Sequence, residues 1–317
     1  MKTKDFFYHL PEELIAQTPI EPRNSSRLLV LGKDKNTIEH TVFSSLFDHL
    51  KENDCLILNN TRVLPARIYG KKDTGATVEF LLLKNLGNDN WEALAGPGRR
   101  AKPGTEFTFS DKLSCKVLET TPEGNRIIHF EYEGEFFSLL DEVGQMPLPH
   151  YITEKLNDNE RYQTVYSKEM GSAAAPTAGL HFTEEMLAEL KEKGINIGYV
   201  TLHVGLGTFR PVKAENITDH TMHTEHYVVP KETAELINNT KENGGRVICV
   251  GTTSCRTLES AALVSSSLWS LCVWIERHAE NSKAMILALS RSLVLDIEDS
   301  IVAPARDSTV STEPVVC

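Results

Sequence analysis

The sequence lacks any run of about 18 uncharged apolar residues, so it predicts no membrane-spanning helix. Its first residues, Met1 to Phe6, contain no apolar core of the kind that a secretory signal needs, and we expect none. The six cysteines form no CxxC pair, which argues against a disulfide scaffold and a zinc ribbon. These absences together predict a protein of a reducing, cytoplasmic compartment.

Positive charge is also scarce, with 33 Lys and Arg against 44 Asp and Glu and a net charge of −11. This balance argues against sequence-blind coating of nucleic acid, although it leaves a local basic patch open. The apolar fraction of 40% and the charged fraction of 24% are typical of globular proteins. At about 150 residues per domain, the 317 residues predict two domains.

The order of helical and strand-like patterns along the chain predicts an α/β main domain, with layered sheet and helices. This main domain carries an inserted all-β barrel domain. Residues 1–66 and 149–262 alternate helical and strand-like segments, as in a partly parallel sheet. Residues 67–148 contain short β-type runs separated by Gly, Pro, Asn and Asp, which is typical of a small antiparallel barrel. We expect the main domain to be discontinuous around this insert.

The end of the chain differs from both domains. Residues 263–317 contain no Gly, Phe or Tyr, whereas Trp269 and Trp274 lie close together. We interpret this segment as an atypical tail, of the kind that a frameshift would give. A helix is expected within it at 284–289.

Small residues are concentrated in the stretch from Gly171 to Thr183, which follows Arg161–Tyr166. Small side chains let a ligand or a second backbone approach closely, and the cap at Thr183 would expose helix amides to an anion. A tight structural loop explains the same pattern. The stretch is therefore a candidate binding segment.

Two histidines are candidates for acid–base chemistry. His203 lies at the end of a predicted strand, Ile195–Val204, before a glycine turn, and ligands of α/β sheets sit beyond such strand ends. His181 lies within the small-residue stretch. Imidazole titrates near neutral pH, which suits proton transfer, but either residue fits equally well as a satisfied core histidine.

A second histidine cluster consists of His220, His223 and His226. Neither a helix nor a strand brings all three side chains to one face. Contacts to a substrate, a metal hydrolase centre, and solvated or core histidines are alternative interpretations, and we expect no metal.

Residues 96–104 form a rigid loop that carries Arg99, Arg100 and Lys102 without an acid. Arginine forks match phosphate oxygens and lysine adds a point charge, so the loop is a candidate phosphate contact. The alternative is an ordinary solvated turn.

Two further strand ends carry polar groups. Gly251–Glu259 places hydroxyls and Arg256 directly after a buried strand, and Asn60-Thr61-Arg62 follows another. Such hydroxyls suit a carboxylate or a ribose, and a guanidinium suits a carboxylate. A plain strand–helix cap is the alternative interpretation.

At these residues the chain resembles a known family. The resemblance rests on the blocks Leu14–Gln17, Asn60–Arg67, Arg161–Tyr166, Gly171–Thr183, Thr201–Phe209 and Gly251–Glu259. Together they resemble the S-adenosylmethionine:tRNA ribosyltransferase-isomerases of queuosine biosynthesis. The resemblance runs from residue 1 to about 262. Asn24, His150 and Cys255 depart mildly from the family pattern, and residues 263–317 do not match it.

The resemblance implies a large α/β domain with an inserted β-barrel and a transfer reaction. The ribosyl part of S-adenosylmethionine would move to 7-aminomethyl-7-deazaguanine at a tRNA wobble position, giving epoxyqueuosine-tRNA, adenine and methionine. S-adenosylmethionine would be consumed as a substrate, with no cofactor and no metal. The partners would be S-adenosylmethionine and the anticodon loop of tRNA, with no membrane, and the protein would be a monomer.

Site roles follow from the resemblance as expectations. The catalytic candidates are His203 and His181, with no assignment of base and acid between them. The tRNA-binding candidates are Arg99, Arg100 and Lys102. The substrate-binding candidates are Asn60, Arg62, Arg161, Gln163, Thr164, Tyr166, Thr177, His223, Glu225, Thr252, Thr253, Ser254 and Arg256. A non-catalytic RNA-binding protein, or an inactive truncated homologue, is the alternative function.

Overall fold

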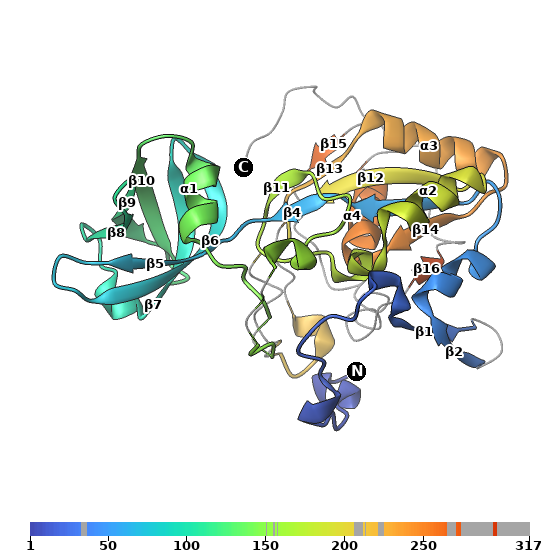
Figure 1. Cartoon of the computed structure of the whole chain (residues 1–317), viewed down its shortest axis with the longest axis horizontal. Helices are drawn as coiled ribbons and strands as arrows, with labels where there is room; N and C mark the ends of the chain where they lie inside the picture. Colours follow the sequence, from blue (N-terminus) through green and yellow to red (C-terminus); the bar gives the residue numbers. More distant parts are fainter. Residues whose placement is uncertain are drawn as a thin grey trace. The chain divides into compact units, whose positions relative to one another are not determined.

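The computed structural model describes residues 1–32, 37–149, 151–154, 156, 158–205, 212, 214–220, 225–264, 271–273 and 294–296. The chain divides into two compact units (Figure 1). The main unit comprises Met1–Thr61, Gln163–Glu169 and Ala175–Cys317, and the barrel unit comprises Arg62–Tyr162 and Met170–Ala174. The barrel unit thus includes chain on both sides of the 67–148 segment that the sequence predicts as the insert.

A six-stranded mixed sheet forms the centre of the main unit, in the order β15-β13-β12-β3-β14-β16. In chain order its strands are β3 (Cys55–Asn59), β12 (Asn196–Leu202), β13 (Tyr227–Val229), β14 (Val247–Val250), β15 (Leu271–Val273) and β16 (Val294–Asp296). Both β12 and β14 pair with β3 in parallel. The carboxyl ends of these three strands therefore meet at one edge of the sheet.

Every residue of β3 and of β14 is buried, so each strand reads as a continuous apolar run, as parallel strands covered on both faces do. Helix α2 (Glu184–Glu192) packs Met186, Leu187 and Leu190 into the same core cluster as Leu56 and Leu58 of β3. Helix α3 (Lys231–Glu242) approaches the opposite face, where Gly198 lies under Thr233 and Leu236. Helix α4 (Gly251–Val264) follows β14 directly.

An ion pair joins the starts of β3 and β14. Arg246 Nη2 lies 2.6 Å from Asp54 Oδ2 and Arg246 Nε lies 3.1 Å from Asp54 Oδ1. Burial favours a raised pKa for the Asp54 carboxyl, but hydrogen bonds from Arg246 and from the Lys51 amide outweigh burial and lower the pKa below its ordinary value. Asp54 thus stays ionised and fixes the two strands side by side.

The remainder of the main unit consists of a small sheet and short 3₁₀ helices. Strands β1 (Arg27–Leu31) and β2 (Ile38–Val42) pair antiparallel. The 3₁₀ helices are η1 (Thr3–Phe6), η2 (Glu12–Leu14), η3 (Arg23–Ser25), η4 (Phe43–His49), η7 (Thr177–His181) and η9 (Ile217–Asp219). The sequence predicts a helix from the spacing of apolar residues at 43–50 and a helix start at Pro11. Both segments adopt 3₁₀ rather than α geometry, because such short segments do not reach the length at which an α-helix is stable.

The barrel unit contains a closed antiparallel barrel in the order β10-β7-β6-β5-β8-β9. Its strands are β5 (Arg67–Lys71), β6 (Thr77–Gly87), β7 (Asn90–Gly96), β8 (Glu106–Ser110), β9 (Leu113–Thr120) and β10 (Arg126–Tyr132), followed by α1 (Phe136–Val143). The 3₁₀ helices η5 (Gly98–Arg100) and η6 (Asn159–Tyr162) also belong to this unit. These strands confirm the predicted all-β barrel beside the α/β domain.

Aromatic rings fill the barrel. The Phe80 and Phe107 ring centroids lie 4.9 Å apart in an edge-to-face arrangement, and Phe130 and Phe136 lie 5.0 Å apart. Such arrangements are favourable for aromatic pairs. The interior of the barrel is therefore a packed core.

Short strands complete the pairing. Strand β4 (Thr61–Val63) forms a two-stranded sheet with β11 (Glu169–Ser172). From the tail, β15 pairs with β13 and β16 pairs with β14. Because residues 263–317 do not match the family pattern, the sequence predicts that the closing elements of the main domain are lost and that an edge strand is unpaired. Instead, β15 and β16 lie at the two edges of the sheet. The helix expected at 284–289 lies outside the described residues.

Within the described part of the chain, no helix is long and apolar enough to span a bilayer.

Candidate active site at the edge of the parallel strands

Two of the predicted site segments meet beyond the carboxyl ends of β3 and β12. Thr61 follows β3 and His203 follows β12, and Thr61 Oγ1 lies 2.8 Å from His203 Nδ1. The Asn59 side chain joins the same strands, since its Nδ2 donates to the Leu202 carbonyl at 3.0 Å. The start of α4 lies at the same edge because β14 also runs parallel to β3. In sheets of this kind, ligands bind at this edge.

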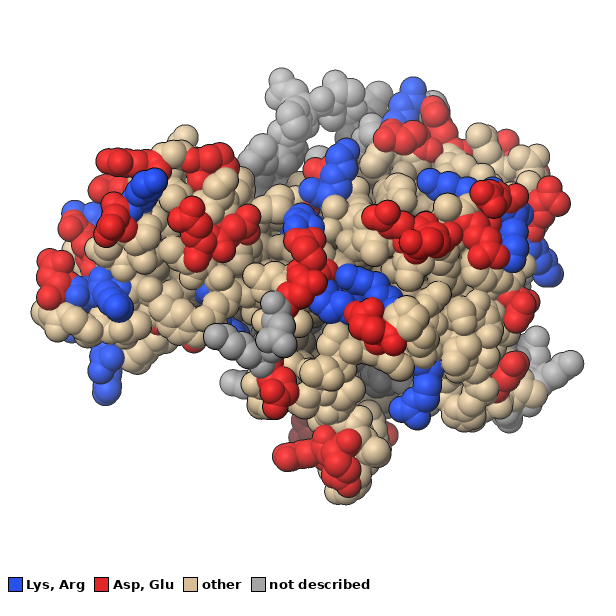
Figure 2. Space-filling view, in the orientation of Figure 1, with Lys and Arg blue, Asp and Glu red and all other residues tan. Residues whose placement is uncertain are grey.

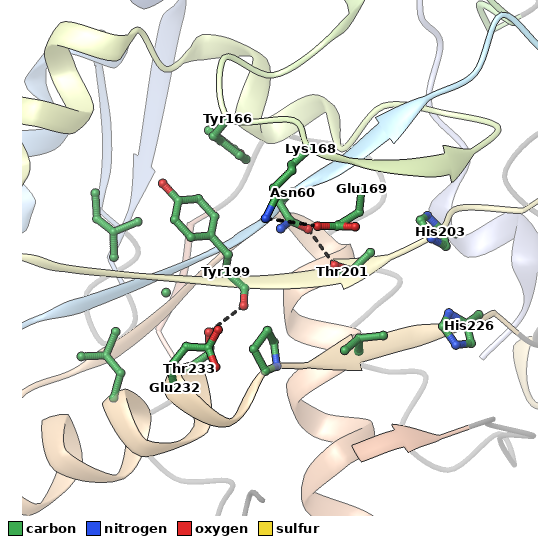
Figure 3. Close-up of a pocket in the computed structure, with 15 residues that line it drawn as sticks. Asn60, Tyr166, Lys168, Glu169, Tyr199, Thr201, His203, His226, Glu232 and Thr233 are labelled. Atoms are coloured by element: carbon green, nitrogen blue, oxygen red, sulfur yellow. Dashed lines mark hydrogen bonds and ion pairs between the residues drawn. The ribbon is translucent and has the colours of Figure 1, made fainter. Parts of the chain in front are cut away.

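A cavity of about 1070 Å³ opens beside β12. Strand β13 pairs with Thr201 and Leu202 of β12, so the sheet is open alongside the preceding residues in the part that is described. Figure 3 shows the labelled polar lining residues distributed along β12 and the segments beside it, with His203 and His226 at one end. The lining consists of Asn60, Tyr166, Lys168, Glu169, Ile197, Gly198, Tyr199, Thr201, His203, His226, Val228, Pro230, Glu232, Thr233 and Leu236.

His203 lies at one end of this cavity. Burial is the main cause that lowers its pKa from 6.5 to about 4, followed by repulsion from His226, while Glu169 acts in the opposite direction. The His203 and His226 rings are nearly parallel, with centroids 6.1 Å apart. At neutral pH His203 is therefore an uncharged imidazole and a proton acceptor.

Polar groups lie along the cavity wall next to His203. The Thr201 hydroxyl donates to Asn60 Oδ1 at 2.7 Å, and the Lys168 amide donates to the Asn60 carbonyl at 2.8 Å. The Lys168 ammonium lies 3.6 Å from a Glu169 carboxylate oxygen (Figure 3). With Glu169 and Glu232 against one lysine, the lining carries more negative than positive charge.

Two tyrosines form another part of the wall. The Tyr166 and Tyr199 ring centroids are 5.8 Å apart. Burial raises the pKa of both phenols, so both remain protonated. The Tyr166 hydroxyl fills the space beside Gly179, where an added Cβ would lie 2.0 Å from it. Gly179 therefore fits here because it has no side chain.

The predicted residues on α4 form a separate group that does not line the cavity. Gly251 begins the helix at a φ of +83°, a conformation that favours glycine. Thr253 Oγ1 and Ser254 Oγ are buried and have no hydrogen-bond partner among the described residues. The Arg256 guanidinium donates to the Glu225 carboxylate, and Glu225 Oε1 accepts the Gly205 amide at 3.0 Å.

The other predicted residues of the main unit lie outside the cavity lining. His181 ends η7 and its ring packs against Phe43, with centroids 5.2 Å apart. Thr177 is exposed at the start of η7, while Gln163 and Thr164 are buried. His223 lies outside the described residues. Of the two histidines predicted to transfer protons, the structure brings His203 to the cavity.

The remaining predicted residues belong to the barrel unit. Arg62 pairs with Glu160, and Arg161 lies in η6. Arg99, Arg100 and Lys102 are exposed on the loop after β7. The predicted substrate-binding residues are thus divided between the two units, and the predicted tRNA-binding residues all belong to the barrel unit.

Several lining residues were not predicted from the sequence. These are Lys168, Glu169, Tyr199, Thr201, Glu232 and Thr233, whereas His226 was considered only in the histidine cluster. A signal was present for two of them, because Tyr199 and Thr201 share one strand face with His203 by the period of two. Lys168 and Glu169 follow the recognised Arg161–Tyr166 block but belong to no motif.

Among the described residues, no group of three or more His, Cys, Asp or Glu side chains is placed to hold a metal ion.

Comparison with known proteins places the chain in a family. The model of the family described as "Queuosine biosynthesis protein" matches residues 3–296, extending past residue 262. A curated relative from Clostridioides difficile (strain 630) is named S-adenosylmethionine:tRNA ribosyltransferase-isomerase and is 59% identical over 278 residues, which cover 87% of this chain and 82% of the relative. A crystal structure titled S-adenosylmethionine tRNA ribosyltransferase from Thermotoga maritima matches with 34% identity and a TM-score of 0.41, over 85% of this chain and 77% of that one. The chain belongs to the queuosine biosynthesis protein family.

Proposed function

We propose that this chain is an S-adenosylmethionine:tRNA ribosyltransferase-isomerase that uses the cavity beside β12 as its active site. It transfers and isomerises the ribosyl part of S-adenosylmethionine onto the aminomethyl group of 7-aminomethyl-7-deazaguanine at the tRNA wobble position. The products are epoxyqueuosine-tRNA, adenine and methionine. Family membership and the name of the 59% identical relative support the reaction class.

The observation that carries the proposal is the uncharged His203 in a cavity whose wall is acidic and aromatic. Ligand cavities usually measure roughly 300–1,000 Å³, and 1070 Å³ lies just above that range. Such a volume has room for a nucleoside donor and for part of an acceptor base. Both must be present at once for group transfer.

His203 is the proton carrier in this proposal. The sulfonium of the donor acidifies the neighbouring C5′ hydrogens, and neutral His203 removes one of them. The resulting imidazolium is disfavoured by burial, which gives it a strong tendency to release the proton. That proton goes to the departing adenine, so His203 returns to its neutral form.

The donor is held by the rest of the lining. The faces of Tyr166 and Tyr199 attract a sulfonium or stack on adenine, and the Glu169 and Glu232 carboxylates favour a cationic donor. Outside that lining, the hydroxyls of Thr253 and Ser254 at the start of α4, which have no hydrogen-bond partner among the described residues, would receive the methionine carboxylate. Arg256 is engaged by Glu225 and would hold the segment around Gly205 in place.

The tRNA is contacted through the barrel loop that carries Arg99, Arg100 and Lys102. Figure 2 shows Lys and Arg interspersed with Asp and Glu over the face in view, without a continuous basic surface. The local cluster of cations on this loop would provide the phosphate contacts. In the reaction, an unstacked base of the anticodon loop would enter the cavity.

The test is incubation with S-adenosylmethionine and tRNA that carries the 7-aminomethyl-7-deazaguanine base. We expect release of adenine by the wild-type chain and loss of release in His203→Gln, with tRNA affinity retained. Tight tRNA binding without adenine release by the wild type would instead support a non-catalytic RNA-binding protein.

A further inference from the structure

The outward face of strand β5 carries an exposed tyrosine between two cations. Arg67, Tyr69 and Lys71 alternate with the buried Ile68 and Gly70, so all three side chains point away from the barrel interior. Tyr69 remains 41% exposed. A large aromatic side chain on a charged outer surface offers a flat apolar face to a partner.

The Tyr69 ring is fixed by its neighbour on β6. Glu79 lies directly opposite Tyr69 in the antiparallel register, and the Tyr69 hydroxyl donates to Glu79 Oε2 at 3.1 Å. Arg67 Nε lies 3.6 Å from the other Glu79 oxygen. The carboxylate therefore holds the ring at the surface while Arg67 balances its charge.

Lys71 on β5 and Arg100 on the loop after β7 have no carboxylate partner among the described residues. Lys71 lies opposite the uncharged Thr77 of β6 and Thr108 of β8. Arg100 uses one guanidinium nitrogen to donate to the Thr77 carbonyl at 3.4 Å, which brings it over the same end of β6. By contrast, Lys116 on the far side of β8 is paired with Glu106 at 2.9 Å.

Hydrogen bonds from a buried arginine stabilise the conformation of the loop that carries Arg100. The buried Arg126 guanidinium donates to the carbonyls of Gly98 at 2.8 Å, Ala101 at 2.5 Å and Gly124 at 2.5 Å. An added Cβ at Gly98 would lie 3.0 Å from Arg126 Nη2, so the fit is close. Arg100 is therefore presented by an ordered loop, which lowers the entropy cost of binding a phosphate there.

We propose that the Tyr69 face, formed by Arg67, Tyr69, Lys71 and Arg100, binds single-stranded RNA by stacking one base on the Tyr69 ring. Lys71 and Arg100 contact the phosphates on either side of that base. The occupant is an unpaired nucleotide of the tRNA substrate, a choice that rests on the proposed function. Stacking platforms flanked by cations are the general means of holding single strands.

The test measures the affinity of the full-length chain for an anticodon stem–loop RNA over a series of salt concentrations. Tyr69→Leu removes the stacking face, and we expect about tenfold weaker binding. Tyr69→Phe keeps the ring and should bind like the wild type although it loses the bond to Glu79. Lys71→Gln should reduce the salt slope by about 0.7, the value for one phosphate contact on a single strand.

Lys116→Gln is the matched control, since it removes a paired cation from the same barrel and should leave both affinity and slope unchanged. Wild-type affinity in Tyr69→Leu overturns the proposal, as does equal weakening in Tyr69→Phe and Tyr69→Leu. Equal competition by duplex RNA overturns the stacking contact as well.

Adenine release keeps the two proposals apart. If the wild type releases adenine and Tyr69→Leu binds RNA normally, the Tyr69 face fails alone. If the wild type releases none but RNA binding depends on Tyr69, the proposed reaction fails alone.

Discussion

The two units of this chain solve the same packing problem in opposite ways. The barrel closes its six strands on themselves and fills the interior with rings such as Phe80 and Phe107. The main unit keeps an open sheet in which β13 pairs with only the last residues of β12, and a cavity of about 1070 Å³ lies beside the gap. Closure gives a unit that presents its chemistry on the outside, whereas incomplete pairing gives a unit that can enclose a substrate.

The charged groups follow this division. In the main unit, burial shifts the pKa of His203 and of both cavity tyrosines. On the barrel, Arg99, Arg100 and Lys102 are exposed to solvent. The proposed proton transfer thus falls in the main unit and the proposed phosphate contact in the barrel unit.

The largest expected effect tests whether the chemistry lies in the main-unit cavity. His203→Gln retains hydrogen-bonding capacity toward Thr61 but cannot carry a proton, so adenine release should fall about 10²–10⁴-fold. His181→Gln is the matched control, because His181 packs against Phe43 away from the lining and should change release little. Wild-type release by His203→Gln would remove His203 from the mechanism.

The next effect tests the filled barrel. Phe107 is 1% exposed, and Phe107→Ala should cost about 3–5 kcal/mol of unfolding free energy in a urea titration, because it removes a buried ring and leaves a cavity. Leu118→Ala, at a side chain that is 47% exposed, should cost far less. Hydrogen exchange should accelerate in β5 to β10; acceleration of the same size in β3 and β12 would show that the units do not unfold separately.

A smaller effect tests how the open sheet is held together. Arg246→Met leaves the Asp54 carboxylate, which is 2% exposed, without its guanidinium. We expect a loss of about 2–3 kcal/mol, less than for a fully buried pair because the Arg246 side chain is 23% exposed. Lys116→Met breaks an exposed barrel pair and should cost under about 1 kcal/mol; equal losses would contradict the contrast between the units.

The last effect, absent at neutral pH, is a pH dependence that belongs to the main unit. The pKa of His203 is lowered from 6.5 to about 4, so the unfolded chain binds a proton in this window that the folded chain does not. Stability should therefore decrease as the pH falls from 6.5 toward 4, and His203→Gln should flatten that decrease. Urea titrations at several pH values measure it. Asp54 acts at lower pH, since its stabilisation is lost only below its ordinary pKa of 3.8.

Much of the fold was predictable because local patterns of apolar residues determine where its strands form. The all-buried runs Cys55–Asn59 and Val247–Val250 form parallel strands, and the punctuated runs of 67–148 form the barrel. The 3₁₀ helices at 12–14 and 43–49 were expected as helices without this geometry, since spacing alone does not separate the two forms.

The site was predictable only in part. Asn60 and His203 follow strands whose ends meet, so topology alone brings them together. The cavity depends on where β13 stops pairing with β12, which is a long-range property that no local motif records. Tyr199 and Thr201 could have been found from the alternation with His203, whereas Lys168 and Glu169 could not.

The discontinuity of the main unit also fixes an order of events during synthesis. Strand β3 leaves the ribosome early, but its parallel neighbours β12 and β14 follow only after all of Arg67–Tyr132 has been made. Domains generally fold as units during translation. The barrel, whose strands pair over short distances in the sequence, can therefore fold before the strands that pair with β3 have been synthesised. The apolar Cys55-Leu56-Ile57-Leu58 segment consequently remains without its neighbouring strands until β12 and β14 have been synthesised.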